Sequence, residues 1–330
     1  MLAMAPDLPD RLFNHGSRQR LSAAFEIDWD QPVVSDLTAL PGEWLAGVEV
    51  LLTGWGAAEI DAGLLSRMPD LRSIHHAAGS VRRLVGDSCW DRGIRVTTAA
   101  EANAIPVGEY AAAMIVLAAK QIFRSQVLYR ARRAFIPREK EFPHAGNFGT
   151  VIGLVGASRI GRHVIELLRS HQLDVLVYDP FLGEEEAEAF GVEVVSLEDL
   201  FTRSAVVSLH APLMPATAGM VTAELLGRMQ DGATLINTAR GGLVDADALE
   251  SELVSGRLWA VLDATDPNEP LPPDSALYEL PNVVVTPHMA GAVGNELQRL
   301  GDHAVEQALR AHRGEPLAGE VTRETVGELA

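Results

Sequence analysis

The sequence predicts an α/β protein in which a doubly wound parallel sheet forms the larger part. From residue 150 onward, short apolar runs alternate with amphipathic helical segments, the pattern of a parallel sheet covered by helices. A glycine-containing turn from Gly156 to Gly161 joins the first apolar run to a helical segment, and Asp179 ends the second run. Polar residues follow most of the predicted strands, at the edge where open parallel sheets bind ligands.

The composition indicates two domains. At 330 residues, the chain is long enough for two cores at about 100 to 200 residues each. Its net charge of −18 argues against a nucleic-acid partner, because such proteins carry a basic footprint. The single cysteine, Cys89, fits a reducing compartment, and the N-terminal residues lack the pattern of a secretory signal. The apolar run Ala111–Ala119 is too short to span a bilayer, so we expect a soluble cytoplasmic protein without a membrane partner.

The first hundred residues contain three apolar runs that we expect to be buried strands: Val48–Thr53, Leu71–His75 and Ile94–Thr98. Helical segments separate them, so this part already has α/β character. Pro106 then suits the start of a helix, and Val107–Phe123 is alanine-rich and apolar nearly all round. Such a helix has to be buried, and we place it at the junction of two domains.

The rest of the chain alternates strands and helices after an irregular connection at residues 125–149. The predicted strands are Val151–Val155, Asp174–Tyr178, Val192–Val195, Ala205–Leu209, Ala233–Asn237, Leu258–Leu262 and Asn282–Thr286. Asp245 is expected to cap a helix that Gly256 ends. An amphipathic helix at Asn295–His312 is expected to return to the first domain.

The turn from Gly156 to Gly161 has the features of a dinucleotide site. Glycine at 156 permits a turn that a side chain would block, glycine at 161 lets the helix lie close to the sheet, and the helix N-terminus suits a pyrophosphate. Asp179, about 20 residues further on, can accept hydrogen bonds from ribose hydroxyls and would repel a 2′-phosphate, which favours NAD over NADP. Ser158 occupies the position of a second glycine, so we expect a reshaped phosphate contact. The alternative interpretation is an ordinary strand-to-helix turn.

Residues that could bind a ligand or react follow the predicted strands at one edge of the sheet. They are Gly156, Asp179, His210, Thr238, Ala239, Arg240, Asp263 and His288. The planar guanidinium of Arg240 suits a carboxylate, and His288 can give or take a proton near neutral pH. With a dinucleotide, these groups suit hydride transfer at the carbon next to a carboxylate. No metal site is expected.

Longer motifs resemble the D-isomer-specific 2-hydroxyacid dehydrogenase family over most of the chain. They are Asn103 with Val107-Gly108-Glu109-Tyr110, the glycine turn with Asp179, Val207 to Pro212, Leu235 to Asp245, Leu262-Asp263, Glu269 to Pro272 and Asn282 to His288. The resemblance implies a Rossmann-type NAD-binding domain at 105–291 and a smaller flavodoxin-like α/β substrate domain made of 1–104 and 292–330. It also implies a homodimer formed through the NAD-binding domain, with residues 125–149 as a candidate contact.

By this resemblance, Arg240 binds the substrate carboxylate, His288 is the general acid or base, and Glu269 pairs with His288. The residues implied to bind NAD are Gly156, Ser158, Arg159, Ile160, Gly161, Asp179, His210, Ala211, Pro212, Thr217, Thr238, Ala239 and Asp263, and those implied to contact the substrate are Ala78, Gly79 and Asn103. The protein is then expected to interconvert a small 2-oxo acid and a D-2-hydroxy acid, and the sequence does not identify which.

The acid partner of His288 is where the chain departs from the family pattern. One residue is inserted between Asp263 and Glu269, so at the usual spacing Asn268 would face His288. We expect Glu269 to be the partner, because the segment from Arg240 to Asp263 is one residue short and restores the register. Two other functions stay open: an NAD(H)-binding sensor or scaffold with little turnover, and oxidation of a small anion such as formate, which an amide beside the histidine favours.

Overall fold

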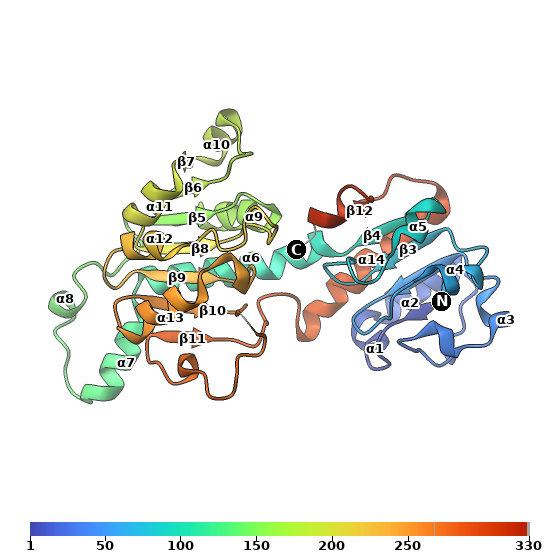
Figure 1. Cartoon of the computed structure of the whole chain (residues 1–330), viewed down its shortest axis with the longest axis horizontal. Coiled ribbons are helices and arrows are strands. Elements are labelled where there is room, and N and C mark those ends of the chain that lie inside the picture. The colour runs from blue at the N-terminus through green and yellow to red at the C-terminus, as the bar shows by residue number, and fades with distance from the viewer. Residues whose placement is uncertain (267, 329–330) are drawn as a thin grey trace. The chain divides into compact units, whose positions relative to one another are not determined.

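The computed structural model describes residues 1–266 and 268–328. The chain forms two compact units: Met1–Ala104 with Ala292–Ala330, termed the first unit, and Ile105–Gly291, termed the second unit. Both are α/β units built on a mainly parallel sheet, which confirms the predicted fold class (Figure 1). The boundary between the units falls within helix α6 (Ala100–Ala119).

A five-stranded sheet forms the centre of the first unit. Its strands, in spatial order, are β1 (Leu2–Ala3), β2 (Val50–Thr53), β3 (Ser73–His76), β4 (Arg95–Thr98) and β12 (Glu320–Val321). The β12–β4 pair is antiparallel and the other pairs are parallel. The sequence predicts β2, β3 and β4 but not β1 or β12, because a two-residue strand shows no periodicity.

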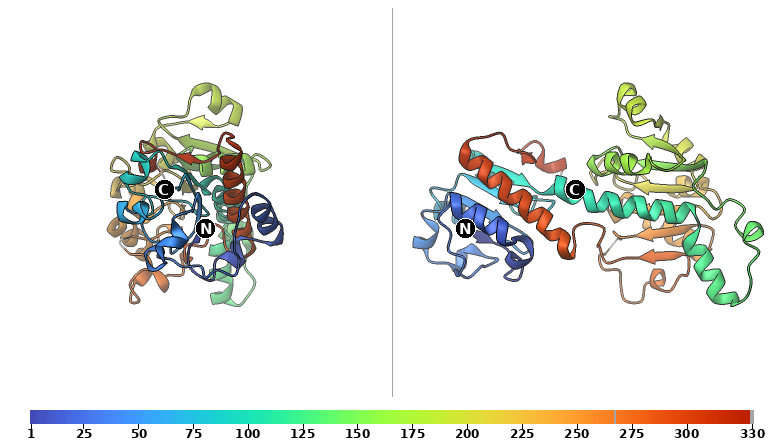
Figure 2. Two further views of the ribbon diagram at one scale, coloured as in Figure 1. Left: turned by 90° about the vertical axis from the view of Figure 1, so that its right-hand side faces the viewer. Right: turned by 180° about the vertical axis from the view of Figure 1, so that it is seen from behind.

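The helices of the first unit include the long one predicted near the C-terminus. They are α1 (Pro9–Leu12), α2 (His15–Ala24), η1 (Leu37–Ala39), α3 (Gly42–Leu45), α4 (Ala62–Ser66), α5 (Asp87–Asp91), η4 (Gly294–Glu296), α14 (Leu297–Arg313) and η5 (Val326–Glu328). Helix α14 lies beside α2 in both views of Figure 2. It also crosses α1 closely, since a Cβ at Gly301 would lie 1.9 Å from the carbonyl oxygen of Leu12.

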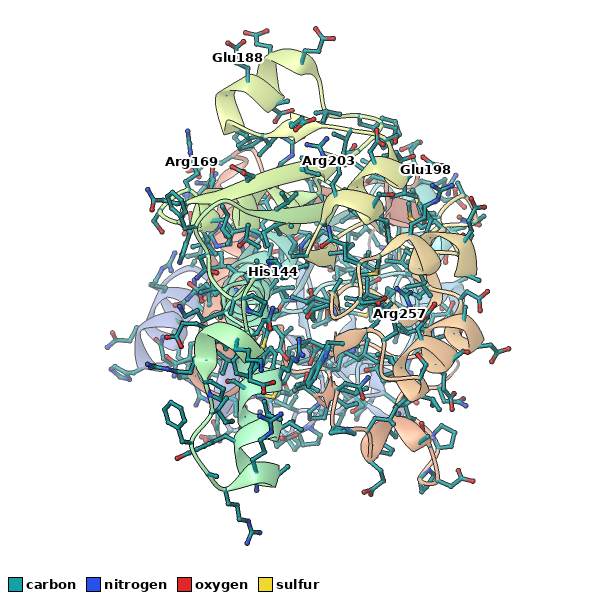
Figure 3. All side chains as sticks on the ribbon, turned by 90° about the vertical axis from the view of Figure 1, so that its left-hand side faces the viewer. His144, Arg169, Glu188, Glu198, Arg203 and Arg257 are labelled. Carbon is teal, nitrogen blue, oxygen red and sulfur yellow. The ribbon has the colours of Figure 1, made fainter. Side chains whose placement is uncertain are left out.

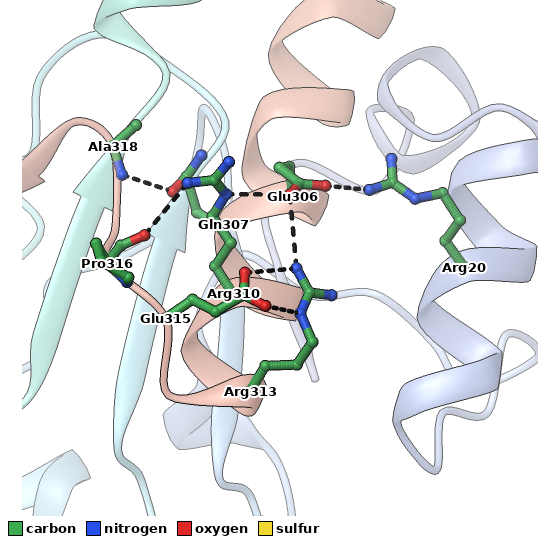
Figure 4. A network of polar contacts seen from close by, with 8 residues as sticks. All are labelled: Arg20, Glu306, Gln307, Arg310, Arg313, Glu315, Pro316 and Ala318. Carbon is green, nitrogen blue, oxygen red and sulfur yellow. Dashed lines mark hydrogen bonds and ion pairs between the residues drawn. The ribbon is translucent and has the colours of Figure 1, made fainter.

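Polar contacts also hold helix α14 in the first unit (Figure 4). Glu306 pairs with Arg20 of α2 and with Arg310 of its own helix. The buried amide oxygen of Gln307 accepts a hydrogen bond of 2.8 Å from the backbone N–H of Ala318. The C-terminal segment is therefore part of the first unit through both apolar and polar contacts.

A seven-stranded, fully parallel sheet forms the centre of the second unit. Its strands, in spatial order, are β11 (Val283–Val285), β10 (Trp259–Leu262), β9 (Thr234–Asn237), β8 (Val206–Leu209), β5 (Thr150–Val155), β6 (Leu173–Tyr178) and β7 (Glu193–Val194). All seven coincide with predicted strands, within one or two residues at each end. The strand order doubles back at β5, the first strand of this sheet along the chain, as in a doubly wound sheet.

The helices of the second unit are α6, α7 (Ile122–Arg132), α8 (Arg138–Glu141), α9 (Arg159–Leu168), α10 (Glu184–Phe190), α11 (Leu197–Arg203), α12 (Ala223–Arg228), η2 (Gly241–Leu243), α13 (Ala246–Val254) and η3 (Ala276–Tyr278). Those that pack on the sheet cover both of its faces. Successive strand residues alternate between two cores: Val206 packs with α6 and α9, and Val207 packs with α11 and α12. Because both faces are covered, the central strands β5, β8, β9 and β10 are mostly apolar, as the sequence predicts.

Helix α6 differs from the prediction at both ends. It begins at Ala100, before the predicted start at Val107, and ends at Ala119, before the predicted end at Phe123. Pro106 therefore lies inside the helix and not at its start. Proline removes one backbone hydrogen bond but does not always end a helix. The turn before it is anchored, since Asn103 N–H donates to the carbonyl of Ala99 at 2.9 Å.

By length and composition, α6 is also the one helix in the described residues that could span a membrane. However, 56% of its apolar window is buried inside the structure. Ala111 and Ile115 pack against Ile152 of the sheet within the second unit. We therefore interpret α6 as a core helix of the second unit.

The connection at residues 125–149 is more regular than predicted, because it contains α7 and α8. Figure 1 shows both helices projecting away from the sheet of the second unit. No residue of α7 is buried, so its sequence has no apolar face by which the helix could be recognised. Gln121 and Arg133 flank it with left-handed backbone conformations, at φ of 53° and 49°.

The outer surface of the second unit carries charged side chains (Figure 3). Glu188 of α10 and Glu198 of α11 extend from its edge, and Arg203 pairs with Glu193 at 2.7 Å. Water screens such exposed pairs, so they add little to stability in comparison with the apolar cores.

Candidate active site

The turn after β5 depends on two close backbone approaches. Gly156 has a φ of +102°, and a Cβ on it would lie 2.7 Å from the backbone nitrogen of Ala211. A Cβ on Gly161 would lie 2.1 Å from the carbonyl oxygen of Gly156. A side chain at either position would therefore push the turn, helix α9 and the β8 end apart, which explains both glycines physically.

Ser158 fits the turn without a glycine conformation. Its φ of −63° and ψ of 178° are open to any residue. The hydroxyl donates a 2.8 Å hydrogen bond to the carbonyl of His210 and accepts one from Gly161 N–H at 3.4 Å. The serine thus caps α9 and joins the turn to the β8 end. The N–H groups of Arg159 and Ile160 follow in the first turn of the helix, where the helix itself supplies no acceptor.

Asp179 lies at the end of β6 and braces the same turn. Its carboxylate accepts hydrogen bonds from the backbone N–H of Ala157 at 2.6 Å and of Phe181 at 2.8 Å. Each carboxylate oxygen can accept more than one hydrogen bond, so ribose hydroxyls could still bind. The sequence places Asp179 correctly at the strand end, but it does not reveal this second, structural use of the carboxylate.

Buried polar atoms lie unpaired at the ends of β8 and β9. Neither ring nitrogen of His210 nor the hydroxyl of Thr238 has a hydrogen-bond partner among the described residues. Burial lowers the pKa of His210 to about 4, so the ring is neutral at physiological pH. Buried polar groups are normally paired in folded proteins. A dinucleotide at this edge would supply partners, so these residues fit the cofactor that the sequence predicts.

The segment after His210 forms a tight turn. Ala211 is buried next to Gly156, and Pro212 begins the turn. The hydroxyl of Thr217 donates to the carbonyl of Pro212 at 2.6 Å and accepts from the N–H of Met214 at 2.8 Å. Thr217 therefore stabilises the turn itself, and its expected place beside the cofactor phosphates stays a prediction.

The loop after β9 orients Arg240. The side chain of Asn237 accepts a hydrogen bond from the N–H of Ala239 at 3.1 Å and donates to the carbonyl of Arg240 at 2.9 Å. A Cβ on Gly241 would lie 2.2 Å from the backbone of Thr265, so this loop lies directly against the loop that follows β10. The guanidinium of Arg240 is half-buried and donates to the carbonyl of Ala239.

His288 follows β11 and pairs with Glu269. The Glu269 carboxylate hydrogen bonds to Nδ1 of His288, and both side chains remain nearly half exposed, at 42% and 45%. Asn268 instead uses its backbone carbonyl to accept from the hydroxyl of Thr265 at 2.8 Å. His288 has a φ of +50°, a left-handed conformation that costs about 1–3 kcal/mol in a residue other than glycine. Such strain is typical of functional positions.

Asp263, at the end of β10, holds the segment that carries His288. Its buried carboxylate accepts hydrogen bonds from the hydroxyl of Thr286 at 2.6 Å and from the N–H groups of Met289 at 2.8 Å and Ala290 at 2.9 Å. The family resemblance implies that Asp263 binds NAD, and this contact remains a prediction. The structure adds a role in orienting the loop from 286 to 290.

Ala78, Gly79 and Asn103 belong to the first unit, where the structure brings them together. The N–H of Ala99 donates to the carbonyl of Ala78 at 3.0 Å, and the carbonyl of Ala99 accepts from Asn103. The Asn103 side chain accepts from the N–H of Ala292 at 2.8 Å. The loop after β3 and the start of α6 therefore lie at the same edge of the first sheet.

Sequence reasoning did not identify Asn237 or Thr286 as contributors to the site. Both lie at strand ends, close to residues that the sequence analysis selected. Asn237 directly precedes Thr238, and Thr286 precedes His288 by two positions. Their side-chain chemistry could have identified them, because an amide or hydroxyl at the end of a buried strand normally forms hydrogen bonds with a neighbouring loop.

Comparison with known proteins agrees with this geometry. Residues 112–290 match the model of the NAD binding domain of D-isomer specific 2-hydroxyacid dehydrogenases, so the second unit carries that domain and its cofactor is NAD. The chain is 34% identical to D-3-phosphoglycerate dehydrogenase of Mycobacterium leprae over 262 residues, which are 78% of this chain and 48% of the relative. It is 31% identical to (S)-sulfolactate dehydrogenase of Chromohalobacter salexigens over 86% of this chain and 91% of that one.

A solved phosphoglycerate oxidoreductase from Rhizobium etli has a similar structure, with a TM-score of 0.80 at 28% identity over 98% of each chain. The chain spans about half the length of the phosphoglycerate dehydrogenases that it matches. The resemblance read from the sequence is confirmed: the chain belongs to the D-isomer-specific 2-hydroxyacid dehydrogenase family.

Proposed function

We propose that the protein is an NAD-dependent oxidoreductase that interconverts a 2-oxo acid and a D-2-hydroxy acid. The observation that carries this proposal is the succession of Arg240, Glu269 and His288 after three adjacent strands, β9, β10 and β11. A cation with a planar fork and a proton donor held by an acid are the groups that reduction of a 2-oxo acid requires. The family to which the chain belongs supports the same reaction.

The residues would divide the work as follows. Arg240 would bind the substrate carboxylate and polarise the 2-oxo group. His288 would give a proton from Nε2 to the substrate oxygen during reduction and take it back during oxidation. Glu269 accepts from Nδ1, which fixes the ring so that Nε2 remains available. NADH, when bound, supplies the hydride for C2.

We further propose that the first unit is the substrate domain. Backbone N–H groups of Ala78 and Gly79, with Asn103, would contact the substrate carboxylate. Arg82 and Arg83 follow this loop and are exposed, and Arg82 donates to the carbonyl of Val326 at 3.3 Å. Two exposed cations at this position favour a substrate with a second anionic group. The names of two relatives refer to such substrates, phosphoglycerate and sulfolactate.

The oxidation of NADH with a panel of 2-oxo acids tests the reaction. The panel contains glyoxylate, pyruvate, hydroxypyruvate, branched and aromatic 2-oxo acids, and acids with a phosphate or sulfonate tail. We expect fast turnover of at least one member with NADH and weak turnover with NADPH. Preference for a tailed acid that disappears in Arg82→Ala and Arg83→Ala would assign those arginines to the tail.

Two other outcomes would replace the proposal. NADH binding without turnover of any member would indicate a sensor or scaffold. Oxidation of formate by NAD would indicate a dehydrogenase of small anions, although Glu269, and not the Asn268 amide, pairs with His288.

We also propose a cytoplasmic homodimer formed through α7 and α8. Tyr129, Phe135 and Phe148 are 62%, 86% and 84% exposed in this part of the second unit. Large apolar side chains that are exposed together are typical of interfaces. Light scattering should give twice the chain mass, and Phe135→Asp should shift the mass toward that of one chain.

A further inference from the structure

A chain of hydroxyl groups connects helix α6 to the Asp263 carboxylate. The hydroxyls of Tyr110 and Thr286 lie 2.9 Å apart, and the Thr286 hydroxyl donates to Asp263 at 2.6 Å. An ionised carboxylate can only accept hydrogen bonds, so the single hydroxyl hydrogen of Thr286 is donated to Asp263. Tyr110 must then be the donor to Thr286. The order of the three groups is therefore fixed: tyrosine to threonine to aspartate.

The far side of Asp263 holds the backbone just after His288. One carboxylate oxygen accepts from the N–H of Met289 and the other accepts from the N–H of Ala290. Hydrogen bonds to a charged group are stronger than those between neutral groups. Together they can offset the left-handed backbone conformation of His288, which is the strained point of the segment.

Among the described hydrogen bonds, none joins the side chain of Tyr110 or Thr286 directly to His288. Thr286 is linked to His288 through the backbone, where the N–H of His288 donates to the carbonyl of Thr286 at 2.9 Å. The Tyr110 side chain packs against the core between the sheet and helices α6 and α9. Tyr110 is half-buried, and its pKa is raised, chiefly by burial, so the phenol keeps its proton. The charge of Asp263 acts in the same direction.

We propose that Tyr110 and Thr286 are positioning residues for His288. The two residues act in series through Asp263. Their hydrogen bonds fix the rotation of the Asp263 carboxylate, and the carboxylate in turn holds the backbone that positions the imidazole of His288. This inference rests on the proposed role of His288 in proton transfer. It adds two residues that do not react themselves, and one of them, Tyr110, lies more than 100 positions before Arg240, Glu269 and His288 in the sequence.

The test is a double-mutant cycle with Tyr110→Phe and Thr286→Val. For each variant, kcat with the best 2-oxo acid and the affinity for NADH are measured. We expect kcat to fall about threefold in Tyr110→Phe and about tenfold in Thr286→Val, with less than a roughly threefold change in NADH affinity. The double variant should be no slower than Thr286→Val, because the two groups act in series. Thr286→Ser should restore most of the turnover. Additive losses, or no rescue by serine, would overturn the proposal.

Thr202→Val is the matched control. It also removes a threonine hydroxyl in the second unit, where exposed Thr202 donates to the Glu198 carbonyl of its own helix. We expect wild-type turnover in this variant.

Amide hydrogen exchange of residues 288–291 separates this inference from the proposed function. Exchange should be several-fold faster in Thr286→Val and, to a smaller extent, in Tyr110→Phe, whether or not a substrate has been found. If exchange stays at the wild-type rate, the positioning chain is wrong even in an active enzyme. If Thr286→Val does not fold, the exchange rate of Tyr110→Phe decides in the same way.

Discussion

The Glu269 carboxylate hydrogen bonds to Nδ1 of His288, although one residue is inserted in the segment that leads to it. In the loop after β10, the Asn268 carbonyl accepts a hydrogen bond from the Thr265 hydroxyl, and the next residue, Glu269, pairs with the histidine. The pair leaves Nε2 as the nitrogen that can face a substrate.

Replacing Glu269 with Gln should lower kcat about 10- to 100-fold, because a neutral amide stabilises the imidazolium less and no longer selects one ring orientation. Steady-state rates with NADH and the best 2-oxo acid measure this effect. Asn268→Ala provides the control in the neighbouring position and should retain wild-type turnover. A strong effect of the Asn268 substitution with a weak one of Glu269→Gln would reverse the assignment of the partner.

Replacing His288 with Ala should lower turnover by about 10²- to 10⁴-fold, the usual contribution of general acid–base catalysis. NADH affinity should change little, since the imidazole is not expected to hold the cofactor. Turnover and NADH binding should be measured on the same preparation. Near-full activity of the variant would remove His288 from the proton transfer.

The parts of the site that the sequence predicts are those with local signals. The turn with Gly156 and Gly161 has a strict spacing, and His288 follows an apolar strand, so both could be placed without a structure. The three bonds that Asp263 accepts join residues more than 20 positions apart, and no local pattern records them. Helix α7 was missed for a different reason, because none of its residues is buried and no apolar face marks it in the sequence.

Replacing Gly161 with Ala should destabilise the second unit by about 1–3 kcal/mol, the usual range for an overpacked site. The added Cβ would lie 2.1 Å from the backbone oxygen of Gly156, which cannot move without opening the turn. NADH affinity should also fall, as measured by titration of cofactor fluorescence. Gly227→Ala in α12 is the matched control, because a Cβ there meets no atom within 4 Å. Equal stability of the two variants would contradict the close approach.

The first unit should lose stability in acid because of His75 and His76 on β3. Burial lowers the pKa of His75 to about 3 and of His76 to about 4. In the unfolded chain both titrate near the ordinary value of about 6.5, so below that pH the unfolded state binds more protons than the folded state. Their contribution to stability is therefore complete above about pH 6.5 and is lost as the pH falls toward 4.

For His76 alone the loss amounts to roughly 3 kcal/mol, at about 1.4 kcal/mol for each pKa unit. Urea unfolding between pH 4 and pH 7 measures it. His76→Gln can still pair with the Thr53 hydroxyl, which lies 2.9 Å from Nδ1, but it does not titrate, so its stability should depend less on pH. His15→Gln removes an exposed histidine and should leave the pH dependence unchanged. The same slope in His76→Gln as in the wild type would show that another group causes the acid sensitivity.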